Sequence, residues 1–185
     1  VIDTEIEDVK IIEPRVFKDD RGYFFESFSE KEFQEKVCKT IFVQDNESCS
    51  SYGVLRGLHF QKAPHAQSKL VRVIQGKVLD VAVDIRRGSP QYKQWVAVEL
   101  TEENKKQLFV PRGFAHGFLT LTDNVEVQYK ADNYYAPECD GNIRYDDPEI
   151  GIDWGLGEFI LSEKDQRAPL LRERQELNFI YGENT

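Results

Sequence analysis

The chain has 185 residues, a formal net charge of −9 at pH 7, 40% hydrophobic residues and 31% charged residues. This length predicts one domain over residues 1–185 that buries its own core, and the acidic balance argues against a nucleic-acid partner, which normally requires a basic face. No apolar run approaches the roughly 18 residues of a membrane span and no secretion signal is recognisable, so no membrane partner is expected.

The cysteine pattern indicates a reducing compartment. Cys38, Cys49 and Cys139 are widely spaced and odd in number, whereas disulfide frameworks usually pair an even number of cysteines in a short secreted chain. We therefore expect no disulfide framework and a cytoplasmic location.

The first third of the chain predicts short strands around one helix. Residues 9–17 are typical of an edge strand because Pro14 interrupts them. A turn over residues 19–22 leads to an aromatic strand over 23–28. Ser29, followed three residues later by Glu32, is typical of a capping box, so a short helix is expected as far as about Val37.

The middle of the chain predicts more strands. Two alternating runs, residues 69–74 and 77–85, are joined by Gln75 and Gly76 and predict a β-hairpin. In the second run Asp80 and Asp84 share one face. Further strands are expected over residues 41–48, 95–100, 108–110, 119–121 and 125–130.

The last third predicts little regular structure. Residues 133–153 are rich in Tyr, Pro, Gly and Asp, which is typical of a loop, and Ser162 begins a short helix that Pro169 stops. The charged tail after about residue 171 is expected to be loose. Many short strands with regular turns and few helices predict an all-β fold, an antiparallel barrel or sandwich.

One segment carries the chemistry-bearing residues. Leu55 to Gln61 places Arg56 and His59 on a strand, and Lys69 follows eight residues later. Because side chains alternate along a strand, Arg56 and His59 face one ligand only if the chain bends at Gly57. A base between two cations suggests a site that binds an anion and moves a proton; the alternative is a half-buried structural histidine between solvated charges.

A second segment adds a histidine. Pro111 to His116 resembles the second signature of the cupin superfamily, a P-x-G-x-x-H turn. Metal-binding cupins take two histidines and a carboxylate from the first signature, but here Gln61 stands at the second histidine and Lys69 near the carboxylate. An ammonium repels a cation, so no metal is expected, although His65 remains an alternative ligand.

The candidate residues form a set suited to proton transfer. His59 can accept a proton near neutral pH, and either Asp165 or Asp84 is placed to fix its tautomer. Tyr129, at an inward-facing position, is a candidate for exchanging a proton on the opposite side; an interior aromatic with a bonded hydroxyl is the alternative. Lys69 is suited to stabilising an enolate oxygen.

Several segments together resemble the dTDP-4-dehydrorhamnose 3,5-epimerase family, in order along nearly the whole chain. They are FVQDN (42–46), GVLRGLHFQ (53–61), QSKLVRV (67–73), DVAVD (80–84), PRGFAHGF (111–118) and SEKD (162–165). The resemblance implies a cupin-type jelly-roll barrel with a few short peripheral helices and no cofactor. It also implies a homodimer that acts on a dTDP-sugar, dTDP-4-dehydro-6-deoxy-D-glucose, in the third step of dTDP-L-rhamnose biosynthesis.

The resemblance also implies residue roles. His59 matches the proton acceptor, Asp165 its carboxylate partner, Tyr129 the proton donor and Lys69 the residue that stabilises the C4 enolate. The matched substrate-contacting positions are Arg21, Glu26, Gln44, Asn46, Arg56, His116, Tyr135, Asp140 and Lys164. Of these, Arg21 and Glu26 lie in a segment that can come from a partner subunit, and Tyr135 matches an aromatic that stacks on thymine.

Other interpretations of these residues and of the whole chain stay open. Arg21 could be a turn arginine, and Gln44 and Asn46 could bond only a neighbouring loop. For the chain, the alternatives are an epimerase that inverts only C3 or only C5, a non-catalytic sugar-nucleotide-binding cupin, and a metal-dependent cupin enzyme.

Overall fold

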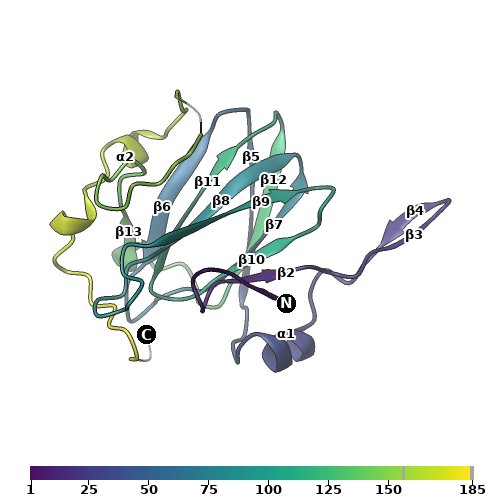
Figure 1. Ribbon diagram of the computed structural model, residues 1–185, viewed down its shortest axis with the longest axis horizontal. Helices are drawn as coiled ribbons and strands as arrows, with labels where there is room; N and C mark the ends of the chain where they lie inside the picture. Colours follow the sequence, from purple (N-terminus) through teal and green to yellow (C-terminus); the bar gives the residue numbers. More distant parts are fainter. Residues whose placement is uncertain (156, 184–185) are drawn as a thin grey trace.

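The computed structural model describes residues 1–155 and 157–183 and consists mainly of two antiparallel sheets (Figure 1). The six-stranded sheet has the order β1 (Ile2–Asp3), β2 (Lys10–Ile12), β10 (Gln107–Val110), β7 (Lys69–Gln75), β12 (Val125–Ala131) and β5 (Gln44–Ser50). The five-stranded sheet has the order β13 (Asp140–Asn142), β6 (Leu55–Gln61), β11 (Phe114–Thr120), β8 (Lys77–Asp84) and β9 (Trp95–Thr101). The predicted all-β, cupin-type jelly roll is confirmed.

The barrel interior is an apolar core that both sheets supply. Val71 of β7 and Val127 of β12 pack there with Val78 and Ala82 of β8. Val81 and Val83 point to the opposite face of β8, into a second core. This alternation follows from the two-residue period of a strand. It places Asp80 and Asp84 on one face of β8, as predicted, and the structure turns that face inward.

The predicted hairpin over residues 69–85 is wrong in its pairing, although both of its strands exist. β7 pairs with β10 and β12 in the six-stranded sheet, whereas β8 pairs with β11 and β9 in the other sheet. Gln75 and Gly76 therefore carry the chain from one sheet to the other. Gly76 has φ +83°, and a Cβ there would lie 2.9 Å from Val125 Cγ2, so glycine suits this corner.

The described part of the C-terminal segment, as far as residue 183, is packed through two buried side chains rather than loose, so that prediction is wrong. Leu177 and Phe179 are buried in the core on the outer face of the five-stranded sheet. The ring centroids of Phe179 and Phe60 lie 6.2 Å apart in an edge-to-face contact. The backbone carbonyl of Phe179 accepts a hydrogen bond from Arg87 N. Burial of two large side chains outweighs the charged composition of this segment.

The helices are short and peripheral. The predicted cap of α1 (Glu30–Lys36) is confirmed in part, since Ser29 Oγ accepts from Glu32 N while the Glu32 carboxylate pairs with Lys36 instead. The other helical segments are α2 (Glu163–Gln166), η1 (Pro137–Cys139) and η2 (Leu171–Glu173). None of the helices in the described part of the chain has the length and apolarity that crossing a bilayer requires.

A two-stranded arm projects from the body of the molecule (Figure 1). β3 (Phe17–Asp19) and β4 (Gly22–Phe24) form a separate two-stranded sheet among the described strands, joined by the predicted turn. The aromatic side chains of Phe17, Tyr23 and Phe24 on this arm are all exposed, Phe24 to 72%. An extended ribbon with apolar side chains in water is typical of a segment that packs on a partner.

Candidate active site

The central feature of the site is a hydrogen bond between His59 on β6 and Asp165 in α2. His59 Nε2 lies 2.6 Å from Asp165 Oδ1, and Gly57 N donates to Asp165 Oδ2 at 3.2 Å. Burial works to raise the pKa of Asp165, but the hydrogen bonds from His59 and Gly57 hold that pKa below its ordinary value. The carboxylate is therefore ionised and accepts a hydrogen bond from His59 Nε2.

This pairing decides between the two predicted carboxylate partners. Asp84 instead binds Arg86, at 2.8 Å, and accepts from Ser89 Oγ at 2.6 Å. Because Asp165 fixes the proton of neutral His59 on Nε2, the lone pair lies on Nδ1. The Nδ1 atom is thus the proton acceptor that this geometry provides.

β6 is irregular at Gly57, where a bend was predicted. His59 pairs with His116 on β11, and the register shifts between His116 and Phe118, opposite Gly57. Gly57 has φ +145°, and a Cβ there would lie 2.6 Å from Gly117 Cα, which no side chain tolerates. Arg56, beside it, is exposed and donates from Nε to Ser50 Oγ at 3.1 Å.

Lys69 and Tyr129 lie together on the six-stranded sheet. Lys69 Nζ is 5.3 Å from the centroid of the Tyr129 ring and the lysine is only 8% exposed. Burial lowers the pKa of Lys69 to about 8, against the charges of Asp80 and Asp140. Burial raises the pKa of Tyr129, while a hydrogen bond with Asn46 opposes that rise. At neutral pH Lys69 is therefore mainly a cation, and Tyr129 is a neutral phenol.

The two sheets present complementary groups to a common space. The five-stranded sheet supplies His59 and His116, and the six-stranded sheet supplies Lys69 and Tyr129. The charge of Asp140, on β13 at the edge of the five-stranded sheet, acts on both Lys69 and Tyr129. A base on one wall and an acid and a cation on the other can move a proton across a bound molecule.

Two further predicted residues meet beside His59. Asp140 on β13 forms an ion pair with Lys164 of α2. β13 pairs with β6 so that Asn142 lies opposite His59, and Asn142 Nδ2 donates to the Lys164 carbonyl at 3.2 Å. β13 therefore ties the helix that bears Asp165 to the strand that bears His59; the sequence predicted only a loop here.

Gln44, Asn46 and Tyr135 form a chain of contacts at the other edge of the site. Gln44 Nε2 donates to Asn46 Oδ1 at 3.1 Å, and Gln44 Oε1 accepts from Tyr135 N at 3.1 Å. Gln44 thus does bond a neighbouring loop, which was the alternative reading, while it also fixes Asn46 beside Tyr129. The Tyr135 side chain is 59% exposed and available to a flat ligand.

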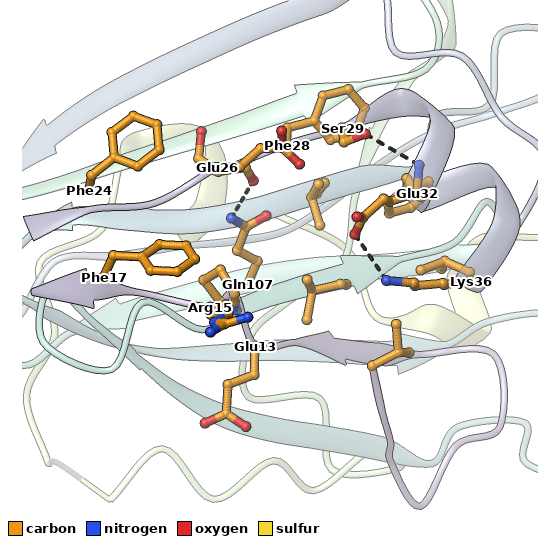
Figure 2. A pocket seen from close by; sticks show the side chains of 17 residues that line it. Glu13, Arg15, Phe17, Phe24, Glu26, Phe28, Ser29, Glu32, Lys36 and Gln107 are labelled. Atoms are coloured by element: carbon orange, nitrogen blue, oxygen red, sulfur yellow. Dashed lines mark hydrogen bonds and ion pairs between the residues drawn. The ribbon is translucent and has the colours of Figure 1, made fainter.

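Arg21 and Glu26 are not brought to this site by the single chain. Arg21 pairs with Asp19 at the turn of the arm, its side chain 91% exposed. Glu26 lines a cavity of about 580 Å³ between the arm and α1. Figure 2 shows Glu26 there with Phe17 and Phe24 of the arm and Phe28 near α1.

The sequence reasoning missed Asp80 as a site residue. Its Oδ1 lies 2.7 Å from His116 Nε2, and the aspartate is fully buried. The signal was an ionisable residue at an inward-facing position between the apolar Val78 and Ala82. Within residues 1–155 and 157–183, no group of three or more His, Cys, Asp or Glu side chains is arranged to hold a metal ion.

Comparisons with known proteins point to a single family. The family model described as dTDP-4-dehydrorhamnose 3,5-epimerase matches residues 3–173. A protein of that name from Escherichia coli is 54% identical over 182 residues, 97% of this chain and 98% of that protein.

Two solved structures are similar over nearly their whole length. A dTDP-6-deoxy-D-glucose-3,5-epimerase from Legionella pneumophila, in complex with dTDP-4-keto-L-rhamnose, is 50% identical with a TM-score of 0.95, covering 98% of both chains. ChmJ, a 3'-monoepimerase from Streptomyces bikiniensis in complex with dTDP-quinovose, is 32% identical with a TM-score of 0.91, covering 98% of this chain and 93% of that one.

Proposed function

This chain belongs to the dTDP-4-dehydrorhamnose 3,5-epimerase family, and we propose that it converts dTDP-4-dehydro-6-deoxy-D-glucose to dTDP-4-dehydro-L-rhamnose by inverting C3 and C5. The observation that carries this proposal is the pair that His59 of the five-stranded sheet forms with Asp165 of α2, together with Lys69 and Tyr129 on the six-stranded sheet. That arrangement suits the removal and return of a proton beside a carbonyl.

The first step is proton abstraction. The C4 ketone acidifies the hydrogens at C3 and C5, and His59 Nδ1 takes one of them while Asp165 stabilises the resulting imidazolium. The electron pair of the broken C–H bond moves into the ring and forms an enolate with its negative charge on the C4 oxygen. The buried Lys69 ammonium stabilises that oxyanion more strongly than an exposed lysine would.

The second step returns a proton on the other face of the sugar. Tyr129, on the opposing sheet, donates its phenolic proton to the same carbon, which inverts the centre and restores the ketone. The Tyr129 phenolate and the His59 imidazolium then exchange protons with water before the next abstraction. No external oxidant or reductant is needed, because the electron pair stays in the sugar.

The remaining predicted residues fit the other parts of a dTDP-sugar. The diphosphate needs charge-assisted donors, which Arg56 provides. The exposed ring of Tyr135 offers a flat face to the thymine. The other residues proposed to contact the substrate are Gln44, Asn46, His116, Asp140 and Lys164.

We infer that the working form is a homodimer in which the arm reaches the partner's site. Among the described residues Arg21 forms its ion pair with Asp19 of the same arm, and the arm exposes Phe17 and Phe24. The cavity beside Glu26 (Figure 2) is large enough to accept side chains of a second copy. The three unpaired thiols fit a cytoplasmic location.

Product stereochemistry tests the proposed function. Incubation with the keto-sugar nucleotide followed by NMR of the product should show inversion at both C3 and C5. Inversion at one carbon alone would instead indicate a monoepimerase, the activity for which ChmJ is named. Binding of the nucleotide sugar without any inversion would favour a non-catalytic binding protein.

A further inference from the structure

Asp80 occupies an unusual position in the barrel. It lies on β8 with Val98 of β9 and Phe118 of β11 as its strand neighbours, both apolar. Its carboxylate is fully buried, and one oxygen is bound to His116 Nε2 at 2.7 Å. A carboxylate in such surroundings costs free energy unless other groups compensate its charge.

The second carboxylate oxygen of Asp80 adds to this cost, because it is buried without a hydrogen-bond partner among the described residues. Within residues 1–155 and 157–183, Asp80 Oδ2 is the one buried side-chain nitrogen or oxygen without a hydrogen-bond partner. Buried polar atoms are rarely left unpaired in folded proteins, and the exceptions concentrate where function requires them.

We propose that Asp80 is a positioning residue for the epimerisation, which holds His116 in one tautomer and keeps Lys69 charged. This inference rests on the proposed function. The carboxylate accepts a hydrogen bond from His116 Nε2, which leaves the lone pair of neutral His116 on Nδ1 and fixes the orientation of the ring. The same charge lies near Lys69 across the barrel interior and favours its ammonium form.

The charged and titratable groups around Asp80 and Lys69 come from four strands. Lys69 is influenced by Asp80 of β8 and Asp140 of β13 and contacts the Tyr129 ring of β12, while its neighbour on β10 is the apolar Val110. Asp80 itself is bonded to His116 of β11. Asp80 is therefore the carboxylate that both bonds to His116 and acts through its charge on Lys69.

The tautomer of His116 tests the first part in the unaltered protein. The chain holds only three histidines, so long-range proton–nitrogen NMR resolves each imidazole. We expect His116 to carry a proton on Nε2 throughout the active pH range. A proton on Nδ1 alone, or fast exchange between the two tautomers, would overturn the assignment, and this readout does not depend on the folding of a variant.

Asp80→Asn tests the second part through the pH profile of kcat. We expect kcat to fall about 10- to 100-fold, less than the roughly 100- to 1,000-fold typical of deleting an oxyanion donor itself. Loss of the negative charge makes Lys69 deprotonate more easily, so the alkaline limb should move to lower pH, with little change in KM. An unmoved alkaline limb in a folded variant would contradict the proposal.

Asp84→Asn is the matched control. Asp84 lies on the same strand and face and is equally buried, but it binds Arg86 and Ser89. This variant should lower the melting temperature without moving the pH profile, and a similar shift in both variants would overturn the role of Asp80. If the wild-type protein does not epimerise, the proposed function fails, while a normal wild type with an unaffected Asp80→Asn refutes this inference alone.

Discussion

His59 Nε2 and Asp165 Oδ1 lie 2.6 Å apart although 106 residues separate them in the chain. Ser162 caps the four-residue helix α2 by accepting from Asp165 N at 3.1 Å, and this cap holds the carboxylate at the start of the helix. The bond fixes which nitrogen of His59 is free to act as the base. The proposed mechanism depends on this relationship.

Replacement of Asp165 by asparagine should impair the base without removing it. The amide can present either its oxygen or its NH2 group to His59 Nε2, so the correct tautomer is no longer fixed. We expect kcat to fall roughly 100- to 10,000-fold, within the range of a lost general base, as measured by steady-state kinetics with the keto-sugar nucleotide. Asp146→Asn, which breaks only the exposed pair with Arg144, should leave kcat unchanged; equal losses in both would contradict the account.

The pH dependence should report Lys69. Burial lowers the pKa of Lys69 to about 8, so the ammonium is present below that pH and is lost as the pH rises through it. We expect kcat to decline above about pH 8 as the oxyanion loses its cation. In Lys69→Arg the charge persists at high pH, so the alkaline decline should disappear even if kcat is lower. A decline that is identical in the variant would assign the titration to another group.

Tyr129→Phe should separate abstraction from reprotonation. The ring and its contact with Lys69 remain, but the phenolic proton is gone. We expect KM to change little and complete epimerisation to slow about 100-fold or more, as for loss of a general acid. Product NMR measures this directly, and unchanged turnover would exclude Tyr129 as the donor.

Mixing two inactive variants should show which subunit supplies Arg21. Consider a heterodimer in which one subunit carries Arg21→Ala and the other carries His59→Ala. If the arms are exchanged, the barrel of the Arg21→Ala subunit has an intact His59 and receives the intact arm of its partner, so one of the two sites is complete. Random re-association of equal amounts should therefore restore about a quarter of the wild-type activity. No recovery, in samples shown by ultracentrifugation to exchange subunits, would place Arg21 outside the partner's site.

The strands were predictable from the sequence, but their partners were not. Alternation identified residues 69–74 and 77–85 as strands, and Gly76 marked the turn. A local pattern cannot distinguish a hairpin from a corner between two sheets, because both need a tight turn between alternating strands. The pairing is decided by β10, β11 and β12, which lie far away in the sequence.

The site was predictable to the extent that a motif carried it. His59, Lys69 and His116 lie in short recognisable segments, and Tyr129 followed from its inward parity. Asp80 lies in the matched segment DVAVD (80–84), but the sequence predicted no role for it. Its contact with His116 forms only when β8 and β11 pair. The packing of Phe179 could not be read from a charged tail, because burial there depends on Phe60.

The measurement that tests the central claim most directly is proton exchange in heavy water. The keto-sugar nucleotide is incubated in deuterium oxide with the wild-type protein and with His59→Ala, and the sugar is examined by NMR. The account predicts deuterium at both C3 and C5 with the wild type and none above the enzyme-free rate with the variant. Near-normal exchange in His59→Ala, or no exchange with the wild type, would contradict it.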